Sequence, residues 1–187
     1  LDVASFDPKR LLFVAHRKEI LTQAQQAFKL FMPNKSYGWF GDGIKDKNCD
    51  FVFASIQTIG RKQNLEIFSK DHFDYIVVDE FHHAGASSYR KLVEYFEPQF
   101  FLGLTATPNR TDNIDILQFC DNNLVYKKDL LDAINLDLLC NFEYFGIHDK
   151  HVDYTKISWK GSKFDEGELE TALSTAKRAE YVLENWK

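Results

Sequence analysis

Residues 75–82 read YIVVDEFH, and this stretch decides the fold. The apolar residues from Tyr75 to Val78 predict a short strand that is buried on both faces of a sheet. Two adjacent acids, Asp79 and Glu80, follow directly and therefore fall at the carboxyl end of that strand. Because open α/β sheets bind their ligands at this edge, we expect the two acids to belong to a binding site.

The pair of acids carries an electrostatic cost that points to a cation. Two neighbouring carboxylates repel each other unless a cation or a proton compensates, and nucleotide-bound Mg²⁺ prefers carboxylate, water and phosphate oxygens. In P-loop NTPases an acid at this place holds the metal ion, and a further residue orients the attacking water. The alternative is an N-terminal helix cap, a position that also favours Asp and Glu. The motif on its own leaves both interpretations open.

Three other apolar runs along the chain have the length and composition of buried strands. They are residues 11–15 (LLFVA), 51–55 (FVFAS) and 100–104 (FFLGL). Between these runs, helical spacing of apolar residues extends from Ile20 to Phe31, and helices also fit residues 65–68 and 88–96. This alternation predicts an α/β fold in which a parallel sheet is covered by helices on both faces. The glycines at 38, 41 and 43 predict a turn-rich connection after the first helix.

A polar cluster follows each of these other strands as well. Residues 14–17 (VAHR) end the first strand, where an arginine fork at a helix N-terminus suits a phosphate. A solvated Arg17 beside a His16 bonded to local backbone is an equally good interpretation. Residues 54–58 (ASIQT) carry hydroxyl and amide groups that suit a sugar–phosphate backbone. Residues 104–108 (LTATP) carry two hydroxyls that can bridge groups at a sheet edge, although such Thr-rich ends before a proline are common in loops.

Taken together, the four clusters resemble the first motor domain of superfamily 2 helicases, the DEAD/DEAH-box and restriction-translocase group. Residues 14–17 look like motif Ia and residues 54–58 like motif Ic. Residues 79–82 are similar to motif II in its DExH form, and residues 105–108 to motif III. The resemblance covers residues 9–110 and implies a RecA-like parallel sheet, which makes the chain a partial P-loop NTPase domain.

The resemblance also implies a role for each residue of the nucleotide pocket. Asp79 and Glu80 form the Mg²⁺ site, which holds the ion through water, and Glu80 orients and deprotonates the attacking water. His82 links this pocket to motif III, where Thr105 and Thr107 relay the nucleotide state to the nucleic-acid groove.

The same resemblance places four residues along the nucleic-acid backbone: His16, Arg17, Gln57 and Thr58. Phe81 departs from the Ala or Cys that is commoner at its position in the family. Because that position points away from the chemistry, we interpret Phe81 as a packing variation.

One departure from the family is an absence. The phosphate loop G-x-x-x-x-G-K-[ST] occurs nowhere in the 187 residues. In the family this loop precedes motif Ia, so we expect it upstream of Leu1, and we expect the arginines of a second motor domain beyond Lys187. The chain alone should therefore hydrolyse ATP poorly or not at all.

The sequence pattern changes near residue 130. Residues 1–129 are predicted to be the first RecA-like motor domain without its phosphate-loop segment. Residues 130–187 are predicted to be a connector, alone or with the start of a second motor domain. Within this tail, residues 141–148 predict one more strand, and Asp165 with Glu168 predicts the capped start of a single final helix. The apolar face of that helix comprises Leu169, Leu173, Ala176, Ala179 and Leu183.

Composition narrows the class of protein. The net charge of −5 excludes binding to nucleic acid by bulk charge alone, but not through a local basic groove. No apolar run approaches the roughly 18 residues of a membrane span, so no membrane partner is expected.

Cys49, Cys120 and Cys140 are too few and too far apart for a disulfide framework or a zinc site. A reducing, cytoplasmic location is therefore expected, at the nucleoid if the protein is bacterial. His148 and His151 could form half a metal site, but no further ligand completes it.

These observations predict an ATP-dependent helicase or translocase that couples ATP hydrolysis to movement on nucleic acid, with ATP and Mg²⁺ as cofactors. The expected partners are nucleic acid, with DNA favoured over RNA, and a second RecA-like domain of the same chain. Two alternatives remain. One is a catalytically inert RecA-like module that binds nucleic acid or a protein, and the other is the motor subunit of a restriction system.

Overall fold

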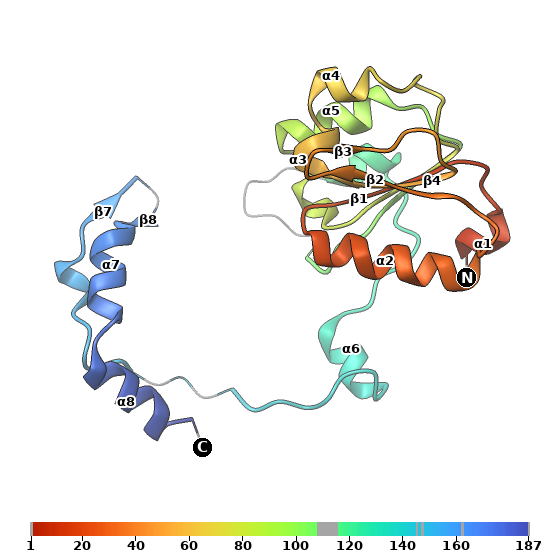
Figure 1. Ribbon diagram of the computed structural model, residues 1–187. Helices are drawn as coiled ribbons and strands as arrows, with labels where there is room; N and C mark the ends of the chain where they lie inside the picture. The colour runs from red at the N-terminus through yellow and green to blue at the C-terminus, as the bar shows by residue number, and fades with distance from the viewer. Residues whose placement is uncertain (1, 108–115, 145, 147, 162, 187) are drawn as a thin grey trace. The chain divides into compact units, whose positions relative to one another are not determined.

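The computed structural model describes residues 2–107, 116–144, 146, 148–161 and 163–186. The chain divides into two compact units, of which the first ends at Lys127 and the second begins at Lys128. Figure 1 shows the first unit as a sheet between helices.

In its described part, the first unit is built on one six-stranded sheet. The strands are β1 (Leu11–Ala15), β2 (Tyr37–Gly41), β3 (Ile44–Lys45), β4 (Phe51–Ser55), β5 (Tyr75–Val78) and β6 (Phe100–Gly103). Their order across the sheet is β3-β2-β4-β1-β5-β6, and every neighbouring pair is parallel except β2 with β3. The predicted strands at residues 11–15, 51–55 and 75–78 are confirmed, and the fourth ends one residue earlier than predicted, at Gly103.

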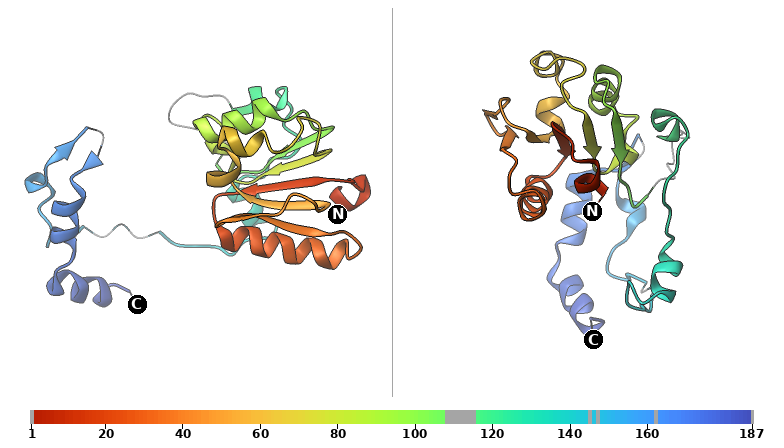
Figure 2. Two further views of the ribbon diagram at one scale, coloured as in Figure 1. Left: turned by 45° about the horizontal axis from the view of Figure 1, so that its top comes forward. Right: turned by 90° about the vertical axis from the view of Figure 1, so that its right-hand side faces the viewer.

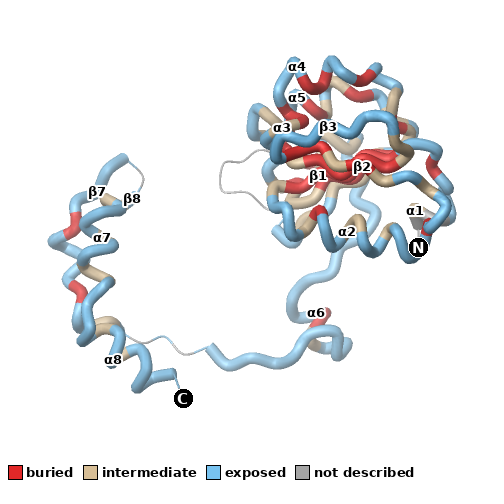
Figure 3. Tube along the Cα trace, viewed as in Figure 1, coloured by how far each residue is buried: buried red, intermediate tan, exposed pale blue. Residues whose placement is uncertain are grey.

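Helices cover both faces of this sheet, as the sequence predicts (Figures 1 and 2). On one face lie α1 (Asp2–Phe6) and α2 (Lys18–Phe31), with Leu21 of α2 fully buried against β1 and β4. On the other face lie α3 (Ile56–Ile59), α4 (Lys62–Leu65) and α5 (Ser87–Tyr95), with Ile59 and Leu92 fully buried. Figure 3 shows the buried residues concentrated in the strands between these two layers. Strands enclosed on both faces have no polar side, which is why their sequences are continuous apolar runs.

The predicted turn-rich connection at residues 38–43 is wrong for Gly38 and Gly41, which lie inside β2. Gly38 is there because of close packing, since an added Cβ would lie 2.2 Å from the Cys49 Sγ. The turn begins only after β2, at Asp42 and Gly43, whose φ angles of 51° and 84° are both positive. Two such residues form the tight hairpin turn that joins β2 to the antiparallel β3.

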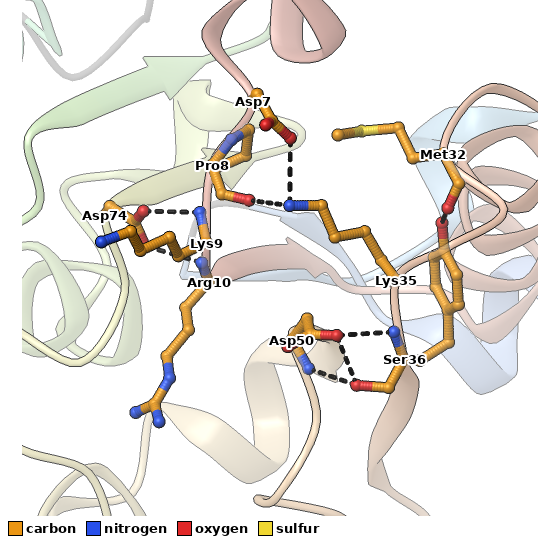
Figure 4. A network of polar contacts seen from close by, with 10 residues as sticks. Asp7, Pro8, Lys9, Arg10, Met32, Lys35, Ser36, Asp50 and Asp74 are labelled. Atoms are coloured by element: carbon orange, nitrogen blue, oxygen red, sulfur yellow. Dashed lines mark hydrogen bonds and ion pairs between the residues drawn. The ribbon is translucent and has the colours of Figure 1, made fainter.

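A polar network fixes the amino-terminal edge of the sheet, opposite to the edge that carries the four clusters (Figure 4). Both Asp74 oxygens accept backbone hydrogen bonds, one from the N–H of Lys9 and one from that of Arg10, at 2.7 Å each. Asp50 accepts from the backbone N–H and the hydroxyl of Ser36, also at 2.7 Å each. These side chains take the place of the missing ladder partners at the points where β1, β2, β4 and β5 begin.

The second unit is small in its described residues and includes a two-stranded antiparallel sheet. Its elements are α6 (Leu130–Asn135), the 3₁₀-helix η3 (Tyr154–Lys156), β7 (Trp159–Lys160), β8 (Lys163–Phe164), α7 (Glu166–Leu173) and α8 (Ala176–Glu184). The predicted strand at residues 141–148 is wrong for the described part of that segment, which is irregular. Phe142 and Tyr144 are 62% and 88% exposed, and without a neighbouring strand an extended segment gains no ladder bonds.

The end of the second unit holds two helices where the sequence analysis predicts one. Asp165 caps α7 as predicted, because its side chain accepts a hydrogen bond of 3.0 Å from the Glu168 N–H. The helix then ends at Leu173, and Thr175 caps a new helix, α8, by accepting from the Arg178 N–H. Hydroxyl side chains compete for backbone bonds in this way and so interrupt helices. Among the helices that the structure describes, none is long and apolar enough to cross a membrane.

Candidate active site and nucleic-acid edge

The four polar clusters meet at one edge of the sheet, as the sequence predicts. The register pairs Ala15 with Ser55, Val14 with Val78, and Val78 with Gly103. Because β1, β4, β5 and β6 are parallel, the residues that follow them all emerge at the carboxyl edge.

The acid pair sits at the end of β5 and does not cap a helix. The Asp79 N–H continues the β1 ladder by donating to the Val14 carbonyl at 2.9 Å. Glu80 has φ 51° and ψ 46°, a left-handed conformation that is uncommon for a residue with a Cβ. It precedes the 3₁₀-helix η1 (Phe81–His83), but its side chain makes no cap hydrogen bond. The helix-cap interpretation is therefore wrong for Glu80, and its carboxylate is available for another partner.

That partner within the protein is His82. Its Nδ1 lies 3.2 Å from the Glu80 Oε2 and 3.1 Å from the Thr105 Oγ1. The tautomer of the ring determines whether Nδ1 donates to the Thr105 hydroxyl or accepts from it, and only a ring with a proton on Nδ1 can donate to the Glu80 carboxylate. The Thr105 Oγ1 in turn accepts from the Thr107 N–H at 3.1 Å. The structure thus brings together Glu80, His82 and Thr105, and Thr107 joins through its backbone; Pro108, the last residue of the cluster, lies outside the described residues.

Phe81 packs against residues of β6 in the core on one face of the sheet, which confirms its interpretation as a packing residue. Its side chain is 3% exposed, and its ring lies 5.5 Å from the Phe101 ring. It presses so closely on Gly103 that an added Cβ there would approach ring atoms at 2.5 and 2.6 Å. Its N–H donates to the Leu104 carbonyl at 2.8 Å, which ties the turn after β5 to the end of β6.

Tyr89 of α5 lies close to the acid pair, and the sequence analysis does not identify it. The residue is 5% exposed, and its hydroxyl has no hydrogen-bond partner among the described residues. Burial, together with the negative charges of Asp79 and Glu80, raises the pKa of Tyr89 to about 12. The hydroxyl is therefore a neutral donor at physiological pH. No pattern in the sequence distinguishes this tyrosine from an ordinary core residue of an amphipathic helix.

Three of the four residues predicted to face nucleic acid are linked to one another, and the fourth, Thr58, bonds to Ser55. The Gln57 side chain donates to the His16 carbonyl at 3.1 Å, and the Arg17 Nε donates to the His16 Nε2 at 3.1 Å. The Thr58 hydroxyl accepts from the Ser55 hydroxyl at 2.9 Å. His16 is half-buried, and its Nδ1 has no hydrogen-bond partner in the described part of the chain. Arg17 and Gln57 are exposed, and these are the two side chains that are open to a ligand.

The acid pair fits a divalent cation by its chemistry. Glu80 is 35% exposed, and Asp79 is half-buried and makes no side-chain hydrogen bond or ion pair to any described residue. Mg²⁺ is typically held by one or two carboxylates together with water and substrate phosphates, so a larger cluster of protein ligands is not required.

Residues 3–110 match the protein family described as "Type III restriction enzyme, res subunit". The chain belongs to this family. The matched residues include the acid pair, His82, Thr105 and Thr107, and all four residues of the predicted nucleic-acid edge. The predicted membership in the superfamily 2 helicase and restriction-translocase group is thereby confirmed.

Curated relatives of this res-subunit domain are longer proteins. IRC3 of Saccharomyces cerevisiae, an ATP-dependent helicase by name, is 25% identical to this chain. The match covers 94% of the chain and 26% of the length of IRC3. The Escherichia coli type I restriction enzyme EcoAI endonuclease subunit is 26% identical over 85% of the chain and 20% of its own length. The chain therefore spans about a quarter or less of the length of these two relatives.

Among solved structures, the res-subunit domain is similar to the SWI2/SNF2 ATPase core of Sulfolobus solfataricus in complex with double-stranded DNA. The TM-score is 0.48 at 19% identity, over 63% of this chain and 26% of that one. The Hef helicase domain of Pyrococcus furiosus gives a TM-score of 0.49 at 21% identity, over 61% of this chain and 27% of that one.

Proposed function

We propose that the protein is an ATP-dependent helicase or translocase that moves along nucleic acid, with DNA favoured over RNA. The observation that carries this proposal is the joined arrangement of Glu80, His82 and Thr105 beside Asp79, in a chain of the res-subunit family. The helicase relative IRC3, which is named as ATP-dependent, supports the use of ATP. The restriction-enzyme family and the EcoAI relative favour DNA.

In this proposal each residue of the site has a defined task. Asp79 holds the Mg²⁺ of the nucleotide through water, and the ion supplies charge neutralisation for the phosphate oxygens. Glu80 orients the attacking water and accepts its proton. His82 keeps the Glu80 carboxylate in place when its Nδ1 carries a proton, over a contact of 3.2 Å.

The same contacts couple the pocket to the nucleic-acid edge. A change in the charge or position of Glu80 alters its bond to His82, and His82 shares its Nδ1 contact with Thr105. Thr105 and Thr107 would thus transmit the nucleotide state toward the groove. Residues 130–187 would connect this domain to a second RecA-like domain. The 187 residues alone, which contain no G-x-x-x-x-G-K-[ST], would turn over ATP poorly.

The test is the Glu80→Gln variant of the full-length protein, assayed for ATP turnover with and without nucleic acid. The substitution preserves the shape but removes the base, so we expect turnover to fall by at least about a hundredfold while ATP binding persists. Glu94→Gln is the matched control, because Glu94 is exposed on α5 and pairs only with Arg90 in the described contacts. Near-normal turnover in Glu80→Gln would contradict the role of Glu80.

A second candidate is the motor subunit of a restriction system, which the family description and the EcoAI relative favour. It predicts ATP turnover that DNA stimulates and RNA does not. An inert RecA-like module, in contrast, predicts no turnover with either polymer.

A further inference from the structure

Asn64 of α4 is an unusual member of the core. It is 2% exposed and is the one buried amide or charged side chain among the residues that the structure describes. A buried amide is costly unless its donors and acceptor are bonded, so its partners indicate why it is there.

Those partners come from two other segments. The Lys45 Nζ of β3 donates to the Asn64 Oδ1 at 2.7 Å, and the Asn64 Nδ2 donates to the Thr58 carbonyl at 2.7 Å. Thr58 is therefore held from two sides, because the Ser55 hydroxyl also bonds to its Oγ1 at 2.9 Å. We call the bonded series Lys45–Asn64–Thr58 the tether.

The tether ends at the helix that carries two residues of the predicted nucleic-acid edge. Helix α3 has only four residues, Ile56 to Ile59, and includes Gln57 and Thr58. A helix of one turn is not stable by itself, so its position depends on tertiary bonds. Gln57 then fixes the neighbouring cluster, since its side chain bonds to the His16 carbonyl.

Lys45 is an exposed basic residue in β3 of the β2–β3 hairpin and could be taken for a direct phosphate contact. Its ammonium is instead bonded to a neutral, buried amide inside the protein. The next lysine, Lys47, is exposed and has no bond of this kind in the described contacts. The two lysines therefore differ in environment although they carry the same charge.

We propose that Lys45 and Asn64 are positioning residues for nucleic-acid binding, which act by holding Gln57 and Thr58 in place and not through the charge of Lys45. This inference rests on the proposed function, because it assumes that the α3 end of the sheet meets a polynucleotide. The ligand it concerns is a phosphodiester backbone of any sequence.

The experiment measures the affinity of the full-length protein for two unrelated oligonucleotides over a range of salt concentrations. The variants are Lys45→Met, Asn64→Leu and the double variant, and Lys47→Met is the control for lost charge. We expect each tether variant to lose affinity about three- to tenfold, the effect of one or two weakened hydrogen bonds. The double variant should lose no more than either single variant, because one tether is broken in all three.

The salt dependence separates positioning from direct contact. Loss of a phosphate contact lowers the slope of log K against log salt by roughly one unit, whereas loss of a positioning bond leaves it unchanged. We expect an unchanged slope for Lys45→Met, and recovery of affinity in Lys45→Arg, which retains a donor. Three results would each contradict the positioning role of the tether. They are a salt slope lowered by one unit in Lys45→Met, losses of affinity that add in the double variant, and variant affinities equal to that of the wild type.

Two controls keep these outcomes clear. The double variant replaces both partners by apolar groups, which is close to neutral for folding, and the Thr58 carbonyl retains a bond from the Arg61 N–H. Its urea midpoint should therefore match the wild type, while its affinity does not. If the wild-type protein binds neither oligonucleotide, both the proposed function and the positioning role of the tether are contradicted. If the wild-type protein binds and the variants bind with the same affinity, only the positioning role is contradicted.

Discussion

The contact between Phe81 and Gly103 gives a prediction that can be worked out in numbers. A Cβ on Gly103 would lie 2.5 and 2.6 Å from two atoms of the Phe81 ring, well inside normal contact. Gly103→Ala should therefore force the ring to move and cost about 2 kcal/mol, as overpacked cores do. Phe81→Ala should cost about 4 kcal/mol, because the ring is 3% exposed and its removal leaves a cavity in the core beside β6.

The two substitutions together should cost no more than Phe81→Ala alone. The alanine methyl at 103 then occupies space that the ring has left, so the steric cost disappears and part of the cavity is filled. The coupling free energy between the two sites should be about 2 kcal/mol or more, within the range for residues in contact.

The assay is urea unfolding of the 187-residue chain, followed by circular dichroism, for both single variants and the double variant. Gly146→Ala is the control, because an added Cβ at Gly146 meets no atom within 4 Å in the described structure. Additive costs in the double variant, or a Gly103→Ala chain as stable as the wild type, would refute the reasoning.

Three further predictions concern other parts of the first unit. Arg17→Ala should weaken binding of the full-length protein to unrelated oligonucleotides equally, and it should lower the slope of log K against log salt by roughly one unit. The reason is that a phosphate contact releases counterions whatever the base. Identical slopes for the wild type and the variant would show that Arg17 does not contact a phosphate. Hydrogen bonds from the Ser36 backbone and hydroxyl hold the pKa of Asp50 below its usual value, so its contribution to stability is present above about pH 4 and is lost as the pH falls further. Urea midpoints measured from pH 6 downward should therefore fall less steeply below pH 4 in Asp50→Asn than in the wild type, and parallel curves would contradict this. Tyr89→Phe removes a buried hydroxyl donor that has no partner among the described residues, so it should raise the free energy of unfolding by about 1 kcal/mol. Thermal or urea unfolding measures this change. A loss of stability would show that the hydroxyl is hydrogen-bonded in solution.

The sheet, and the edge at which its polar clusters meet, can be predicted from the amino-acid sequence. Strands enclosed on both faces must be continuously apolar, so β1, β4 and β5 were predictable to the residue. Parallel strands bring their carboxyl ends to one edge, and this rule places Asp79 and Glu80 beside Thr105 without any coordinates. The sequence prediction is wrong where one residue type serves two purposes: glycine is common in turns, but Gly38 and Gly41 allow close packing inside β2.

Only the tertiary structure decided which side chains within that edge are bonded to one another. No local sequence pattern marks the contacts of His82 with Glu80 and Thr105, or the left-handed backbone at Glu80. Tyr89 and Asn64 come from helices that look ordinary in sequence, because an orphaned hydroxyl and a bonded amide are properties of their surroundings. Apolar periodicity reports which side of an element is buried, and it carries no information on which buried polar atoms meet, because that is set by contacts between residues far apart in the chain.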